Sequence, residues 1–128
     1  MEKNLNNIRK NELIEIKSWN GLGIPSTKII IISKNKEVYH YCKYKRNSKF
    51  LTDNNIPMES LYLSKTLSDD QFRMLLDFIE NKLIGKSFES EKIRDYGVSI
   101  FGNYLNSNIN INNNLEIVNE LKKIIEEV

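Results

Sequence analysis

Four consecutive isoleucines, residues 29–32, constrain the fold of this chain more than any other feature. β-Branched side chains favour the pleated backbone of a strand, and successive strand residues point to opposite faces of a sheet. Apolar side chains on both faces are typical of a strand that is covered on both sides. The run therefore predicts a central strand over residues 27–33.

A tight turn and a return strand are expected directly after this run. Asn35 lies in the turn between Lys34 and Lys36, and Asn tolerates positive φ better than most residues. The return strand is predicted over residues 37–45. Similar patterns predict further strands over residues 12–19, 59–66 and 96–104, with Gly102 as a candidate bulge, and a short one at 109–111.

Two helices are predicted in the C-terminal half. Ser68 and Gln71 have the spacing of a capping box, in which each side chain bonds to a backbone N–H group of the first turn. The apolar stripe that follows consists of Phe72, Leu75, Leu76, Ile79 and Leu83, and Gly85 provides the C-terminal cap. A final helix is predicted to begin at Asn113, with Ile117, Val118, Leu121, Ile124, Ile125 and Val128 inward.

The order of these elements predicts an α+β fold. Strands that precede helices in runs favour an antiparallel sheet, here of about four to six strands, with two C-terminal-half helices packed on one face. The length of 128 residues fits a single domain, 1–128, in which residues 1–11 are either helical through Leu5 and Ile8 or frayed.

Composition and charge predict a cytoplasmic protein of bacterial or phage origin. No apolar run approaches the ~20 residues that span a bilayer, and the first residues lack the pattern of a signal peptide. Cys42 is the one cysteine, which fits a reducing compartment. Alanine is absent, whereas Asn and Ile occur 18 times each and Lys 15 times, as A/T-rich codons would produce. We expect no membrane association.

No residue pattern indicates catalysis, a cofactor or a metal. His40, the one histidine, shares a strand face with Cys42. Residues two apart on a strand have Cα atoms ~6.6 Å apart and parallel side chains, which does not suit a nucleophile and its base. One Cys and one His are too few for a zinc site, and Gly21 and Gly23 lack the third glycine of a dinucleotide cradle. We therefore expect a protein that is not an enzyme, although acids or His40 brought together by folding remain an alternative.

Basic residues concentrate between positions 28 and 49, where seven Lys or Arg stand against one Glu. Aromatic rings alternate with cations there, a composition that suits protein contacts, since Tyr and Arg are enriched in them. The candidate partner-binding residues are Tyr39, Tyr41, Lys43, Lys45, Arg46 and Lys49. Two alternatives stay open: this edge binds nucleic acid, or the tyrosines pack beneath a helix while the lysines form a solvated edge.

The leading hypothesis is a stoichiometric inhibitor or immunity protein that neutralises a protein toxin or another protein target. In its general character, the chain resembles the immunity proteins of contact-dependent and polymorphic toxin systems, which are small, cytoplasmic and without catalytic residues. Immunity proteins against basic nucleases are usually acidic, because opposite charges speed capture. The net charge of +2 instead indicates a less basic toxin or contact through the acidic helices. The alternative is a small nucleic-acid-binding or regulatory protein. The sequence does not specify an oligomeric state.

Overall fold

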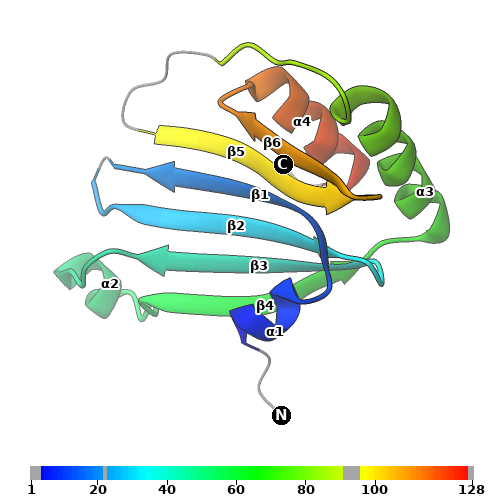
Figure 1. The fold of residues 1–128 in the computed structure, drawn as a ribbon. Helices are drawn as coiled ribbons and strands as arrows, with labels where there is room; N and C mark the ends of the chain where they lie inside the picture. The colour runs from blue at the N-terminus through cyan, green and yellow to red at the C-terminus, as the bar shows by residue number, and fades with distance from the viewer. Residues whose placement is uncertain (1–3, 22, 91–95, 127–128) are drawn as a thin grey trace.

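The computed structural model describes residues 4–21, 23–90 and 96–126 and shows an α+β fold (Figure 1). Its strands are β1 (Glu12–Asn20), β2 (Ser26–Ser33), β3 (Glu37–Tyr44), β4 (Glu59–Thr66), β5 (Tyr96–Tyr104) and β6 (Ser107–Asn112). Its helices are α1 (Leu5–Arg9), α2 (Lys49–Asp53), α3 (Asp69–Phe78), the π-helical turn η1 (Ile79–Leu83) and α4 (Leu115–Ile124). The six strands form one antiparallel sheet in the order β4-β3-β2-β1-β5-β6, which confirms the expected class.

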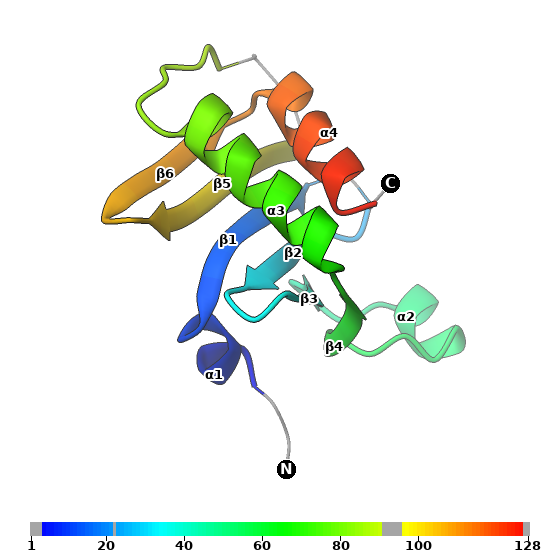
Figure 2. The same cartoon turned by 90° about the vertical axis from the view of Figure 1, so that its right-hand side faces the viewer.

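Strands β1 to β4 form a meander, and the chain then returns across the sheet. Helix α3 and η1 follow β4, and β5 pairs with the free side of β1. Helices α3 and α4 lie side by side on one face of the sheet (Figures 1 and 2). In the described ranges no helix is both long and apolar enough to cross a bilayer, and the longest, α3 and α4, have 10 residues each. Strands β4 and β6 are the two edges of the sheet.

The isoleucine run forms the centre of β2 and is covered on both faces, as expected. Ile30 and Ile32 pack with the residues of α3 and α4. Ile29 and Ile31 lie in a second cluster with Ile8 of α1. Of the two alternatives for the N-terminal residues, the structure shows the helical one, as α1. Asn4 is the N-cap of α1, and its side chain accepts a hydrogen bond from the Asn7 N–H.

The main core lies between the sheet and helices α3 and α4. Its buried members include Ile14, Ile16, Ile32, Val38, Leu75, Ile79, Val98, Ile100, Val118, Leu121 and Ile125. The C-terminal end of α4 is held against β4, because Lys65 Nζ donates to the carbonyl oxygens of Ile125, at 2.9 Å, and Glu126, at 3.1 Å. Val128, predicted to face inward, lies outside the described residues.

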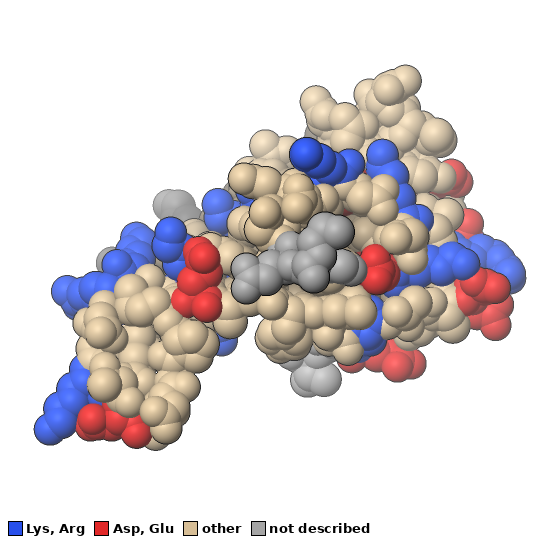
Figure 3. Space-filling view, turned by 90° about the horizontal axis from the view of Figure 1, so that it is seen from below, with Lys and Arg blue, Asp and Glu red and all other residues tan. Residues whose placement is uncertain are grey.

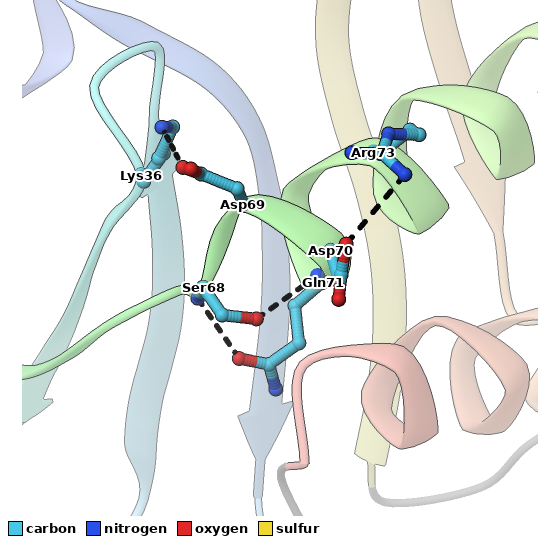
Figure 4. Close-up of polar contacts among 6 residues, drawn as sticks. All are labelled: Lys36, Ser68, Asp69, Asp70, Gln71 and Arg73. Atoms are coloured by element: carbon cyan, nitrogen blue, oxygen red, sulfur yellow. Dashed lines mark hydrogen bonds and ion pairs between the residues drawn. The ribbon is translucent and has the colours of Figure 1, made fainter.

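The predicted capping box at the start of α3 is confirmed (Figure 4). Ser68 Oγ accepts from the Gln71 N–H at 3.1 Å, and Gln71 Oε1 accepts from the Ser68 N–H at 3.0 Å. Asp69 bonds to Lys36 in the β2–β3 turn, and this contact lowers the pKa of the Asp69 carboxyl. The start of α3 therefore lies beside that turn, which also accepts a backbone hydrogen bond from the Leu67 N–H at the Lys36 carbonyl oxygen.

The apolar stripe of this helix is buried unevenly. Leu75, Ile79 and Leu83 are buried, whereas Phe72 and Leu76 are only partly buried. The α-helical pattern ends at Phe78 and widens into η1, which the sequence did not predict. Gly85 follows with φ of +70°, which confirms the predicted left-handed residue.

Three local predictions were wrong in detail. The positive φ of the β2–β3 turn falls on Lys36, at 72°, while the Asn35 side chain accepts hydrogen bonds from Ser33 and Asn11. The N-cap of α4 is Asn114, whose side chain accepts from the Ile117 N–H at 3.1 Å, while the Asn113 side chain accepts from the Val98 N–H at 2.9 Å. The third concerns Gly102.

Gly102 is a point of close approach and not a bulge. Its pairing with Ile14 and Ile109 is regular. The irregularity lies on the neighbouring strand, between Glu12 and Ile14. A Cβ atom at Gly102 would lie 2.8 Å from the Leu13 carbonyl oxygen, so a larger residue does not fit there without a backbone shift.

Candidate protein-contact surface

Tyr39 and Tyr41, the two candidate aromatic residues, are buried beneath α1. They pack with Ile8, Ile29 and Ile31 on the face opposite α3 and α4. The Tyr39 hydroxyl donates to a Glu37 carboxylate oxygen at 3.0 Å. The structure therefore agrees with the alternative prediction that these tyrosines pack beneath a helix. Neither ring offers a free face to a partner.

The Tyr41 hydroxyl is anchored at the end of β4. It donates to Glu59 Oε2 at 2.5 Å. Burial, together with this hydrogen bond and the Glu59 charge, raises the pKa of Tyr41 to about 12. The phenol is therefore neutral at physiological pH and acts as a structural hydrogen-bond donor.

The four candidate cations are exposed, and three of them lie outside β3. Lys43 Nζ is 4.0 Å from Glu59 Oε2, on the same face as Tyr41. Lys45 and Arg46 follow the strand, and Lys49 begins α2. Within the described part of the chain, these last three form no ion pair, so their charges are open to a partner.

Helix α2, which the sequence did not predict, gives this basic region its shape. It interrupts the connection between β3 and β4 and projects from the sheet in two views (Figures 1 and 2). Ser48 caps it by accepting from the Leu51 N–H at 3.3 Å, and Leu51 is buried. Seen from below, a lobe projects on the α2 side of the molecule and carries Lys and Arg at its edge, together with some Asp or Glu (Figure 3).

Large apolar side chains are exposed on α2, on β4 and between them. Phe50 on α2 is 59% exposed, and Tyr62 on β4 is 56% exposed. Met58 and Leu63 are also exposed. Half of the eight large hydrophobic residues exposed in the described ranges therefore come from this one stretch of chain. Exposed apolar residues on an edge strand and the helix before it, with cations nearby in the chain, are typical of a contact surface.

Strand β4 adds an unpaired backbone edge to this surface. It pairs with β3 on one side and stands at the end of the sheet on the other. Lys65, the basic residue of this strand, turns back to cap α4 and does not shield the edge. The N–H and C=O groups of the outer side are thus open to pairing with an added strand.

His40 and Cys42 lie on the opposite face of β3, with the parallel orientation that the sequence indicates. The His40 ring stacks on Tyr62, with centroids 5.5 Å apart and planes inclined by 19°. Cys42 is half-buried and lies beside Tyr44. No group of three or more Cys, His, Asp or Glu residues suited to a metal occurs in the described ranges.

Comparisons of the chain with protein-family models, with curated protein sequences and with solved structures found no match.

Proposed function

We propose that this protein is a non-enzymatic binding protein, most simply a stoichiometric inhibitor or immunity protein that neutralises a protein toxin or another protein target. One observation carries the proposal. Exposed apolar side chains, unpaired cations and an open strand edge all belong to one stretch of chain from the end of β3 to β4, with Tyr62 and Leu63 on opposite faces of the edge strand. We define this contact surface by Lys45, Arg46, Lys49, Phe50, Met58, Tyr62 and Leu63.

The physical basis is the cost of leaving such a surface in water. An aromatic side chain that is more than half exposed gains free energy when a partner covers it, and aromatic residues dominate the affinity of many interfaces. Phe50 and Tyr62 are such residues, on a helix and on the adjacent strand. Cations around them would add directional hydrogen bonds and speed association.

The charge of the surface supports an acidic contact region on the partner. Lys45, Arg46 and Lys49 lack acidic neighbours within hydrogen-bonding distance in the described ranges. This arrangement fits a target that is not strongly basic, in keeping with the net charge of +2. A bacterial or phage origin and a cytoplasmic location remain part of the proposal and rest on composition alone.

Site-specific photo-crosslinking in the native host tests the proposal. A benzoylphenylalanine at position 50, on α2, should capture one protein species at a one-to-one ratio. The matched control carries the same group at Asn110, which is exposed on β6 at the opposite edge of the sheet. Capture of the same species from both positions, or from neither, would contradict the proposal.

Nucleic acid remains the competing partner because three free cations lie close together in the sequence. Four phosphate contacts, from these three cations and Lys43, would give a slope of log K against log salt near ~−3 for a single strand. Base stacking would have to use Phe50 or Tyr62, since Tyr39 and Tyr41 are buried. Submicromolar binding of oligonucleotides at physiological salt, lost on charge reversal of Lys45 and Arg46, would replace the proposed protein partner.

A further inference from the structure

The sheet face that carries α3 and α4 contains one row of small and polar side chains. Ser18, Lys28, Cys42 and Ser60 lie opposite one another on β1, β2, β3 and β4. The adjacent row consists of Ile16, Ile30, His40 and Tyr62 and fills more space. Because serine and cysteine are small, their row leaves a groove of about 490 Å³ lined in addition by Lys122 of α4. The groove results directly from the residue types of this row.

Rings enclose the groove on two sides. His40 and Tyr62 form the stacked pair on one side. Tyr44 lies on the other, where burial and the neighbouring Cys42 raise the pKa of its hydroxyl. Ile56 and Pro57 close the end toward α2. The walls therefore offer flat apolar surfaces with a few hydrogen-bonding groups, as is common in small-molecule sites.

Two lysines give the groove a positive charge. Lys28 and Lys122 line both the groove and an adjoining hollow of about 400 Å³ that reaches Trp19 and Tyr96. None of the described residues that line either space is acidic. In the described part of the chain the ammonium group of neither lysine has a hydrogen bond or an ion pair, unlike that of Lys36, which bonds to Asp69. Lys122 is also half-buried, so its ammonium group has fewer water contacts than an exposed lysine. A bound anion would supply the polar partner that this group lacks.

We propose that this groove binds a small organic anion with a flat ring. The anionic group lies between Lys28 and Lys122, and the ring lies against His40 and Tyr62. The volume falls in the range of ~300–1,000 Å³ that is usual for ligand pockets. This site shares Tyr62 with the proposed protein contact, but none of the other residues of that contact lines the groove, and the inference does not depend on the proposed function.

A pair of dyes that differ in charge tests the inference. The anionic probe is 8-anilinonaphthalene-1-sulfonate, and N-phenyl-1-naphthylamine has the same rings without the sulfonate. We expect saturable one-to-one binding of the anionic dye to the full chain, at least about tenfold tighter than binding of the neutral dye. Inorganic phosphate should compete only at much higher concentration, because it lacks the ring.

Matched lysine variants locate the binding. Lys28→Gln and Lys122→Gln should each weaken the anionic dye by about tenfold, the loss of one charge-assisted contact. Lys17→Gln and Lys123→Gln remove exposed lysines of β1 and α4 that do not line the groove, and should change affinity by less than about twofold. All four sites are on the surface or at its margin, and circular dichroism checks that each variant is folded.

Four results would overturn the inference. The first is no saturable binding of the anionic dye, and the second is equal affinity for the two dyes. The third is equal weakening by Lys122→Gln and Lys123→Gln, which would show that only overall charge matters. Loss of dye binding on Phe50→Ala with both groove lysines intact would place the dye on α2 and would also overturn it.

Discussion

At the scale of single residues, the two glycines of β5 differ in what a side chain would meet. A Cβ at Gly102 would lie 2.8 Å from the Leu13 carbonyl oxygen, which belongs to the backbone and cannot move freely. A Cβ at Gly97 would lie 2.2 Å from the indole of Trp19, but that ring is 47% exposed and can rotate away. Close approach to a backbone atom is therefore the stronger constraint.

We expect Gly102→Ala to lower the free energy of unfolding by about 1–3 kcal/mol, as for other overpacked sites. Gly97→Ala should cost less than about 1 kcal/mol, because an exposed side chain relieves the contact. Urea denaturation of both variants measures the difference. A loss at Gly97 as large as that at Gly102 would show that the Trp19 ring is held in place.

A pair of neighbouring carboxyl groups predicts an unusual dependence of stability on pH. Burial and the Glu15 charge raise the pKa of Glu12 to about 8, and the nearby Arg9 acts in the opposite direction. Arg9 instead pairs with Glu15, with Nη2 and Oε2 3.3 Å apart. In the unfolded chain Glu12 regains its ordinary value of 4.5 and ionises first. The protonated Glu12 carboxyl therefore contributes its full stabilisation of the folded state only at low pH.

The stability of the wild type should fall as pH rises from about 4.5 to about 8, because the folded state binds the additional proton in this range. Glu12→Gln should flatten this fall and stabilise the protein at about pH 8. Denaturant unfolding at several pH values provides the measurement. A wild type that is equally stable at both ends of the range would contradict the expected protonation of Glu12.

At the scale of elements, α3 offers a direct comparison of adjacent positions. Leu75 is fully buried against the sheet, whereas Met74 is 55% exposed. Leu75→Ala should cost about 2–5 kcal/mol through lost packing, and Met74→Ala less than about 0.5 kcal/mol. Thermal or chemical unfolding of the two variants measures this contrast. Similar losses would show that the helix packs in a different orientation.

Elements with a strong local pattern could be predicted from the sequence. The isoleucine run, the capping box at Ser68 and Gln71, and the alternation of β5 all act within a few residues, and each is confirmed. Helix α2 has only five residues, too few for an apolar period, and its one local signal is the Ser48 cap. The widening of the helix at Ile79 has no signal that we recognise.

The candidate surface depended on information that the local sequence lacks. Alternation places Tyr39 and Tyr41 on one face of β3, but only the tertiary fold decides that α1 covers that face. The same applies to Tyr62, which is 56% exposed although its strand β4 contacts the end of α4 through Lys65. The groove combines Lys28 with Lys122, residues from β2 and α4 that no short-range pattern connects.

At the scale of the whole molecule, the helical layer and the projecting helix separate two regions. Helices α3 and α4 cover the β5 side of the sheet and build the main core. The β3–β4 side carries α2, the exposed apolar residues and the cations. The exposed residues of α2 lie outside both buried clusters, so surface variants on α2 should leave the fold intact.

The central claim, one-to-one protein binding through α2 and β4, is tested most directly by calorimetric titration of the captured partner. We predict a stoichiometry near one, no chemical change of the partner, and a loss of at least about tenfold in affinity for Phe50→Ala and for Tyr62→Ala. Asn110→Ala, on the far edge, should bind like the wild type. Unchanged affinity in the Phe50 and Tyr62 variants, or conversion of the partner into a new product, would contradict the claim.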